Sequence, residues 1–472
     1  MTHPTTLTAL EAIDALAAGH LSAVELTRAY LERIGDVGLA SNAFLHLDTN
    51  GALDAAHASD LRRANGTSYH PLDGIPLAVS DNIEVAGMPL TAGMATRRRR
   101  IAQSDAHCIA KLRRAGVVIL GKLNLDEAGF GSRGDNPHFG ACSNPYGSDH
   151  SSGGAASGAA VAVALRLCAL AIAVDGLGSL RVPAAFCGVA AFKPSHSRVS
   201  QRGLISVSKR LDQVGPVARS CNDLSVVFQQ ISGVDALDAQ SRTVPLAHIE
   251  RDPRRLTIGV IAELAAQGIA IDVIESFRQS VERLRGLLPI QDPIAFNDYD
   301  FGHKRCAAQL LCAAEMNLVH ADDLATQPEN FSGHLREQLA AAARASAVDL
   351  IAAEQRLDLA RLKARRIFSV VDVLLTPTAP VAAFAWGTET PEHIADLSSF
   401  ADFAGLPALS VPMGNLNGLP LGLQLVGPRG SDLQLLALGE RIEAVLGRAA
   451  TPPAQDAGGT RRTAYPGRGI IG

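Results

Sequence analysis

Two neighbouring stretches of the chain decide its fold. They are HSSGGAASGAAVAVAL, residues 150–165, and VDGLGSLRVPAAFCGVAAFKPSHSRVS, residues 174–200. The apolar run between them, from Ala159 to Val174, is 16 residues long and is interrupted by Arg166. A membrane-spanning helix needs about 20 apolar residues. The run is therefore expected to form a buried helix followed by a buried strand, and not a membrane segment.

Outward from this core, short apolar segments punctuated by glycine alternate with stretches of helical periodicity. The predicted strands on the N-terminal side are Ile75–Val79, Val117–Leu120, Leu170–Val174 and Val189–Phe192, with a predicted helix at Ala106–Ala115. The first forty residues are expected to form two helices. Each opens with a capping box, a hydroxyl followed three residues later by a carboxylate, at Thr8/Glu11 and Ser22/Glu25. This alternation predicts a mixed α/β sheet covered by helices.

Residues 1–450 are expected to form one domain. Within it, residues 235–370 are dominated by helical periodicity, as in Ile271–Leu288 and Ser332–Phe368, and are expected to be a mainly helical lobe or insertion. Strand signals return at Asp372–Thr376, Ala408–Met413 and Pro420–Val426. The segment 451–472 is rich in Pro and Gly and is expected to be a mobile C-terminal tail.

Composition excludes several classes of protein. The 472 residues carry 43 Lys+Arg against 47 Asp+Glu, a formal net charge of −4, and one Trp. This balance gives no general attraction to nucleic acid or to anionic membranes, so we expect neither as a partner. Seven cysteines without a Cys-x-x-Cys pair favour buried free thiols in a reducing compartment over a disulfide framework. With acidic residues in place of a signal-peptide core at Glu11 and Asp14, the cytoplasm is the expected location.

Four segments together resemble the amidase signature family, whose members hydrolyse amides with a Ser–cis-Ser–Lys triad. They are residues 71–94 (PLDGIPLAVSDNIEVAGMPLTAGM), residues 121–140 (GKLNLDEAGFGSRGDNPHFG), the two core stretches quoted above, and residues 403–428 (FAGLPALSVPMGNLNGLPLGLQLVGP). The resemblance covers most of the chain in order. It implies one α/β domain with a mixed, twisted central β-sheet flanked by helices on both faces. It does not by itself imply function, which depends on the site.

The same resemblance assigns a position to each member of the triad. Family members carry the basic lysine in an IPxAVKDN segment, where this chain has Ser80. The proton-bridging cis-serine falls on Ala155, because Gly153-Gly154 is the glycine pair of the motif; Ser151 and Ser152 lie before it. A serine hydroxyl cannot serve as a base near neutral pH, and an alanine methyl carries no transferable proton.

The nucleophile position is retained in the sequence. Family members read Thr-Asp-x-Gly-Gly-Ser-(Ile/Leu)-Arg, and residues 174–181 of this chain place Ser179 at the nucleophile. Gly176, Leu177 and Gly178 correspond to the oxyanion loop, with Leu177 in place of its first glycine. A leucine there changes the loop or fills space meant for substrate. Ser179 has an alternative interpretation as a turn serine that hydrogen-bonds the backbone.

Other polar residues of the motifs have plain interpretations. Asp175 and Arg181 are expected to form a structural ion pair rather than to act in catalysis. Lys209 is either a solvated turn residue or a relocated base, and Cys187 is expected to be a packing thiol. The histidines at 70, 107, 138 and 150 match no zinc motif, and the glycine-rich stretches match no phosphate-binding fingerprint, so no metal and no cofactor are expected.

The sequence thus favours an amidase-signature protein that resembles C–N hydrolases and has lost the standard amide-hydrolysing triad. Two alternatives stay open. One is an active amide hydrolase that uses Ser179 with a different base, such as Lys209, a histidine or the substrate's own amine. The other is a non-catalytic ligand-binding or partner subunit of an amidase or amidotransferase-like complex. A small amide or carboxylate is the expected ligand, and the chain is expected to act as a homo-oligomer or partner subunit.

Overall fold

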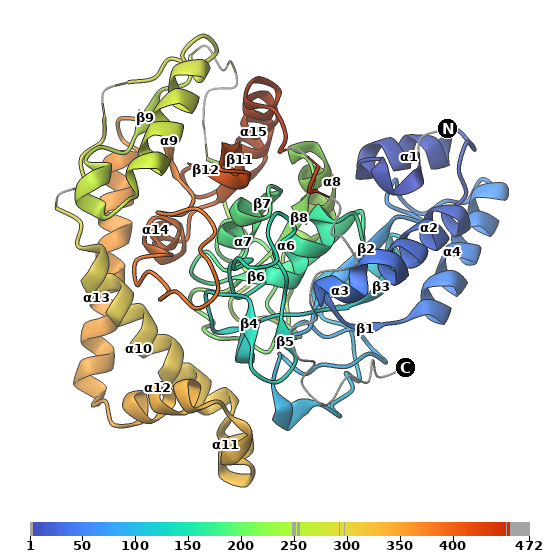
Figure 1. Ribbon diagram of the computed structural model, residues 1–472, viewed down its shortest axis with the longest axis horizontal. Coiled ribbons are helices and arrows are strands. Elements are labelled where there is room, and N and C mark those ends of the chain that lie inside the picture. Colours follow the sequence, from blue (N-terminus) through green and yellow to red (C-terminus); the bar gives the residue numbers. More distant parts are fainter. Residues whose placement is uncertain are drawn as a thin grey trace.

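The computed structural model describes residues 3–247, 252, 255–291, 293–296, 298–449 and 451–453. In these residues one mixed sheet of ten strands runs through the molecule in the order β1-β3-β2-β6-β8-β7-β11-β12-β10-β9 (Figure 1). Its strands are β1 (Phe44–Leu47), β2 (Pro76–Ser80), β3 (Val118–Leu123), β6 (Leu170–Asp175), β7 (Ala190–Lys193), β8 (Gln213–Ala218), β9 (Ile258–Val260), β10 (Val373–Pro377), β11 (Ala408–Leu416) and β12 (Leu419–Val426). A separate two-stranded ribbon pairs β4 (Asp135–Asn136) with β5 (Gly140–Ala141).

The centre of the sheet is parallel on one side and antiparallel on the other. Strand β2 pairs in parallel with both β3 and β6, whereas β6 pairs antiparallel with β8. Every residue of β2, β3, β6 and β8 is buried. Strands covered on both faces are continuously apolar rather than alternating, which explains the uninterrupted Val, Ile, Leu and Ala content that made β2, β3 and β6 visible in the sequence.

Helices flank the sheet on both faces. In the first half of the chain these helices are α1 (Ala9–Ala17), α2 (Ala23–Arg33), α3 (Leu39–Ser41), α4 (Thr49–Ala64), α5 (His107–Arg114), α6 (Ser157–Ala164), α7 (Arg181–Phe186) and α8 (Cys221–Ile231). Helix α6 packs on β6, α7 on β12 and β11, and α8 on β8. The helices α14 (Asp396–Ala404) and α15 (Asp432–Leu446) follow later, and α15 packs against α8 and β11.

A group of helices projects from one end of the molecule, at the lower left of Figure 1. It consists of α10 (Phe301–Val319), α11 (Ala321–Thr326), α12 (Gly333–Ala343) and α13 (Ala347–Ile367), preceded by α9 (Ile271–Leu284) on the sheet. Helix α10 packs against both α12 and α13. The segment 235–370 is thus mainly helical, but it also supplies β9, the edge strand beside β10.

The structure confirms most of the predicted elements and corrects a few. Both predicted capping boxes are formed, at Thr8 with Glu11 and at Ser22 with Glu25. The apolar run after residue 158 forms α6 and β6 as expected, whereas the helix predicted over Ser332–Phe368 is two helices. Strand β8 was not predicted. All seven cysteines are free, but Cys306 is exposed rather than buried. The predicted tail lies outside the described residues except for 451–453.

No helix among the described residues combines the length and the apolar character that crossing a membrane requires.

Candidate active site

The parallel pairing of β2 with β6 brings Ser80 and Ser179, two of the three positions that the resemblance assigns to the triad, to one edge of the sheet. Val79 lies opposite Ile172 in register, so the carboxyl ends of both strands meet at that edge. Ser80 is the last residue of β2 and is 2% exposed. Ser179 follows the end of β6 by four residues and lies two residues before α7 begins at Arg181.

The segment that carries Ala155, the third of these positions, forms backbone hydrogen bonds with the segments that carry Ser179 and Asp126. Ala156 donates its N–H to the carbonyl oxygen of Ser179 at 3.1 Å, and Asp126 donates its N–H to the carbonyl oxygen of Ala155 at 3.1 Å. The peptide bond between Gly154 and Ala155 is cis. The fold therefore gathers the segments that carry Ser80, Ala155 and Ser179 at one place.

The hydroxyl of Ser179 is partly exposed and has no basic partner. Within the described part of the chain, Ser179 Oγ forms no hydrogen bond. Lys209 is exposed, and its backbone N–H donates to Glu315 at 2.8 Å. The four histidines considered as bases contact other residues. His107 contacts Asp235 and Arg202, and His138 bonds Glu127. His150 bonds Asp149, and the Nδ1 of His70 accepts a hydrogen bond from the N–H of Leu72.

A buried lysine lies near Ser80 but on the other face of the sheet. Lys122 on β3 is in register with Val79, so its side chain shares the face of Val79, and Ser80 points to the opposite one. The Lys122 ammonium donates to the carbonyl oxygen of Ile83 and lies 3.6 Å from Asp81 Oδ1. Burial lowers the pKa of Lys122, and the same burial raises the pKa of Asp81 despite the ammonium beside it. This pair braces the end of β2.

The loop between β6 and α7 offers free backbone donors. The Gly178 N–H is occupied by Asp175 Oδ1 at 2.7 Å. In the part of the chain that the structure describes, the N–H groups of Leu177 and Ser179 have no hydrogen-bond partner. The Leu177 side chain is half-buried against the main core, and its carbonyl oxygen accepts from Ser398 Oγ at 3.3 Å. Two unpaired amides beside a hydroxyl suit a carbonyl or carboxylate oxygen.

The fully buried guanidinium of Arg181 holds this loop in place. It makes a bidentate pair with Asp175 at 2.8 and 3.0 Å and bonds Asp402 Oδ2 at 2.7 Å. It also donates to Gln424 Oε1 on β12 and to the carbonyl oxygen of Ser398 on α14. Burial raises the pKa of Asp402 to about 7, although the guanidinium opposes that rise. The predicted ion pair between Asp175 and Arg181 is therefore formed, and both of its side chains are fully buried.

Asp212 belongs to the site although no sequence motif pointed to it. Its Oδ2 accepts from Ser206 Oγ at 2.7 Å and from the N–H groups of Val207 and Ser208 at 2.8 and 3.3 Å. Its Oδ1 lies 2.5 Å from where a Cβ on Gly176 would be. Burial raises the pKa of Asp212 to about 6. In the segment LISVSKRLDQVGP the pair Lys209-Arg210 is the more prominent feature. The signal that could have identified Asp212 is a carboxylate shortly after two serines, which can hydrogen-bond to it.

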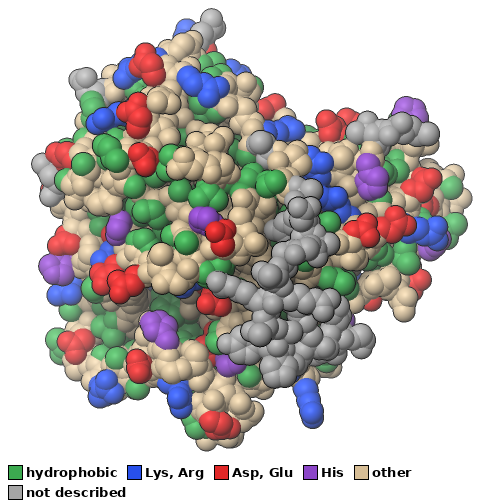
Figure 2. Space-filling model, in the orientation of Figure 1, with side chains coloured by type: hydrophobic (Ala, Val, Ile, Leu, Met, Phe, Trp, Pro, Cys, Tyr) green, Lys and Arg blue, Asp and Glu red, His purple; other side chains and the backbone are tan. Residues whose placement is uncertain are grey.

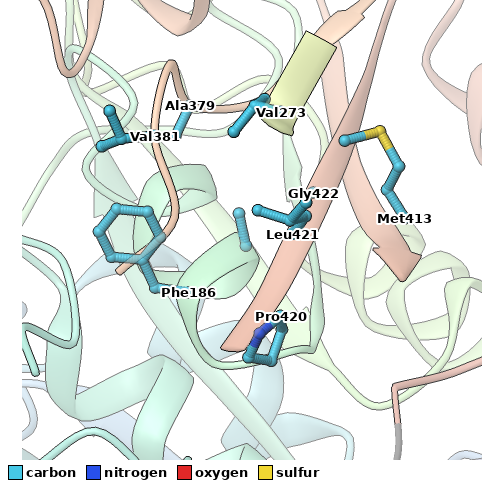
Figure 3. Close-up of a pocket in the computed structure, with 9 residues that line it drawn as sticks. Phe186, Val273, Ala379, Val381, Met413, Pro420, Leu421 and Gly422 are labelled. Carbon is cyan, nitrogen blue, oxygen red and sulfur yellow. The ribbon is translucent and has the colours of Figure 1, made fainter. Parts of the chain in front are cut away.

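The apolar hollow of Figure 3 lies at the far end of α7, away from Ser179. Phe186, Val381 and Leu421 are among the side chains that line it. The hollow is too narrow to admit a water molecule. Among the described residues, no group of three or more His, Cys, Asp or Glu side chains is arranged to hold a metal ion.

The chain is similar to amidases and to amidotransferase subunits along most of its length. A family model described as Amidase matches residues 25–436. The A subunit of the glutamyl-tRNA(Gln) amidotransferase from Chloroflexus aggregans is 34% identical over 471 residues, covering 93% of this chain and 96% of that protein. A chain of a vestigial protein complex bearing on the origins of an s-triazine catabolic enzyme superimposes with a TM-score of 0.86 at 28% identity, covering 94% of this chain and 100% of its own. The native peptide amidase of Stenotrophomonas maltophilia gives a TM-score of 0.82 at 29% identity, with 94% and 98% covered.

Proposed function

Because this chain belongs to the Amidase family, we propose that it binds a small amide or carboxylate in the cradle around Ser179 without hydrolysing it at an enzymatic rate. The single observation that carries the proposal is the isolation of the Ser179 hydroxyl. No lysine, histidine or carboxylate of the described chain accepts its proton. A serine without a neighbouring base is a weak nucleophile at neutral pH.

The chemistry at the other two positions supports the same proposal. Ser80, at the family's lysine position, has no protonation equilibrium near neutrality, and Ala155 cannot relay a proton. A triad acts as one unit, and the residual acceleration after its loss is ~10³–10⁴-fold over water, arising from oxyanion donors and binding alone. Such a rate would not be measurable for an unactivated amide.

The donors that remain suit binding. The free amides of Leu177 and Ser179 and the Ser179 hydroxyl are three hydrogen-bond donors in the 176–179 loop, and Arg181 holds that loop rigid. Donors that are fixed in place before binding lose little entropy when the ligand arrives. A carbonyl or carboxylate oxygen is therefore the expected occupant.

Two measurements test this function. Purified protein should give no turnover of a panel of aliphatic and aryl amides above its Ser179→Ala variant, and a fluorophosphonate probe should leave Ser179 unlabelled by mass spectrometry. A thermal-shift screen of amides, carboxylates and ureas should yield a stabilising compound, since a ligand at one hundred times its Kd adds about 2.7 kcal/mol. Stoichiometric labelling of Ser179 would instead establish an active hydrolase with an unrecognised base.

A role within a multi-subunit complex is the second candidate. It is favoured by the curated relatives, which are A subunits of glutamyl-tRNA(Gln) amidotransferases and cover 93% of this chain. A thermal-shift screen without any stabilising compound, combined with copurification of a stoichiometric second polypeptide, would favour this role. On the face shown in Figure 2, acidic and basic side chains are interspersed, without a broad area of one sign that would suit nucleic acid.

A further inference from the structure

Helix α13 has two apolar faces, and only one of them is packed. The inner face packs against α10 and α14, through Ala353, Leu357, Ala360, Ala364 and Ile367. The opposite face exposes four large apolar side chains: Val348 (73% exposed), Ile351 (58%), Leu359 (51%) and Leu362 (48%). We call these four residues and the exposed Gln355 between them the α13 stripe. A soluble monomer rarely leaves such a row of apolar side chains in water, so the stripe indicates an interaction surface.

The stripe is continuous along the helix. Its members follow one another at spacings of 3, 4, 4 and 3 residues, which keeps them on one side of a helix with 3.6 residues per turn. From Val348 to Leu362 the stripe extends for about 21 Å, taking a rise of 1.5 Å per residue. Helix α13 lies along the outer edge of the molecule in Figure 1, with no described element packed over this face.

The order of residues in the stripe suits a second copy of this chain as the partner. Read from either end, the stripe is the same: apolar, apolar, Gln355, apolar, apolar. If a second α13 lies antiparallel across it with a two-fold axis at Gln355, Val348 meets Leu362 of the second copy and Ile351 meets its Leu359. Such self-complementarity, in which residue i contacts j and j contacts i, is the requirement for an isologous dimer.

The charges beside the stripe do not oppose this pairing. Glu354 and Asp358, on one flank, both pair with Arg210 of the same chain, and Asp358 also pairs with Arg361. The cations Arg356 and Arg361 lie about 100° or more around the helix from the centre of the stripe, given 3.6 residues per turn. Both arginines are exposed, and Arg361 pairs with Asp358, so these charges lie at the rim, where charge contributes little to affinity.

We propose that the α13 stripe is the interface of a two-fold symmetric dimer of this chain, in which two α13 helices pack antiparallel about Gln355. The interface does not depend on whether Ser179 is active. It lies near the site, however, because Arg210, which bonds Glu354 and Asp358 on α13, belongs to the same loop as Asp212, whose Oδ1 approaches Gly176. A seam formed by one helix is smaller than a standard interface of about 800 Å² per partner, so the dimer should dissociate on dilution.

Sedimentation velocity over a concentration series tests the interface. The intact chain should pass from monomer to dimer as concentration rises, and the Ile351→Glu/Leu359→Glu variant should remain monomeric at every concentration. The matched control is Leu61→Glu/Leu237→Glu, which changes two leucines elsewhere that are more exposed than Ile351 and Leu359 (66% and 78%) and should dimerise like the parent. A single monomeric species of the intact chain at its highest soluble concentration, or dimers that survive the Ile351/Leu359 changes, would overturn the proposal.

Cysteine cross-linking tests the antiparallel register. Replacement of the exposed Cys306 by Ser removes the native reactive thiol. In that background, Gln355→Cys should form a disulfide dimer under mild oxidation, because the two-fold axis brings position 355 against itself. Leu362→Cys alone should not, because its partner is position 348. Cross-linking by Leu362→Cys as efficient as by Gln355→Cys would exclude this register, and a normal melting temperature for each variant confirms that it is folded.

Discussion

Ala156 donates its backbone N–H to the carbonyl oxygen of Ser179 at 3.1 Å. This bond holds the segment that carries Ala155 against the segment that carries Ser179, which the family resemblance assigns to the nucleophile. The scaffold of the site is therefore intact at the level of the backbone. At the positions that the resemblance assigns to the base and the proton bridge, the chain has Ser80 and Ala155. Because these differences from the family pattern are differences of side chain, substitution can restore the pattern and test the assignment.

We expect amide hydrolysis to return when Ser80→Lys, Ala155→Ser and Leu177→Gly are combined. A base, a proton bridge and an open oxyanion loop act as one unit, so each single change should leave activity at background. The site of position 80 is buried, and an ammonium placed there without a partner would cost several kcal/mol unless it deprotonates. Hydrolysis of aryl amides and esters, with the Ser179→Ala version of each variant as the blank, measures the effect. A folded triple variant no faster than its blank would show that the register is wrong or that decay has spread further.

Replacement of Arg181 by Ala should destabilise the fold by about 3–5 kcal/mol, the cost of leaving buried partners unpaired. Asp175 and Asp402 would lose a guanidinium in a site with no access to water. The matched control is Arg361→Ala, whose partner Asp358 is half exposed and whose loss should cost at most about 1 kcal/mol. Urea unfolding of both variants measures the difference. Equal midpoints for the two would contradict a structural role for the Arg181 pair.

The stability of the protein should fall between pH 6.5 and pH 4 in part through His320. Burial lowers the pKa of His320 to about 4, and neither ring nitrogen has a hydrogen bond in the described structure. The unfolded chain then binds a proton in this range that the folded chain excludes, so the stability from neutral His320 is present above pH 6.5 and is lost as pH falls. A His320→Leu variant should lose less stability on acidification, by on the order of 1–3 kcal/mol. Parallel pH series of urea midpoints for the two proteins would reveal it, and superimposable series would refute it.

A methyl group at position 176 should strain the oxyanion loop. The Cβ of Gly176→Ala would lie 2.5 Å from Asp212 Oδ1, and Asp212 cannot swing away without breaking the three hydrogen bonds at its Oδ2. Overpacking of this kind typically costs about 1–3 kcal/mol. Gly35→Ala is the control, since nothing lies within 4 Å of its added Cβ. Thermal melting should show a lower midpoint for the first variant only, and an unchanged midpoint for Gly176→Ala would mean that the loop yields freely.

Much of the fold was predictable because its central strands are covered on both faces and are therefore apolar throughout. Strand β8 escaped prediction because QVGPVA contains glycine and proline, which local propensity disfavours in strands. Only the antiparallel pairing with β6, which places Pro216 opposite Ile172, gives that segment its structure. The break between α12 and α13 escaped for the opposite reason, since Arg344–Ser346 carries no Gly or Pro to mark it.

The sequence by itself determined which chemical groups stand at positions 80, 155 and 179, because Ser80, Ala155 and Ser179 are covalent features that folding does not alter. Only the tertiary structure decided what surrounds them. The histidines that could have served as a base contact other residues, and Lys209 is exposed. Lys122 lies on the opposite face of the sheet from Ser80, and Asp212 lies against Gly176. The contact of His107 with Asp235, the register of Lys122 with Val79 and the approach of Asp212 to Gly176 join segments that are distant in the chain. Strand register and helix packing set such proximity, and a local sequence pattern does not contain it.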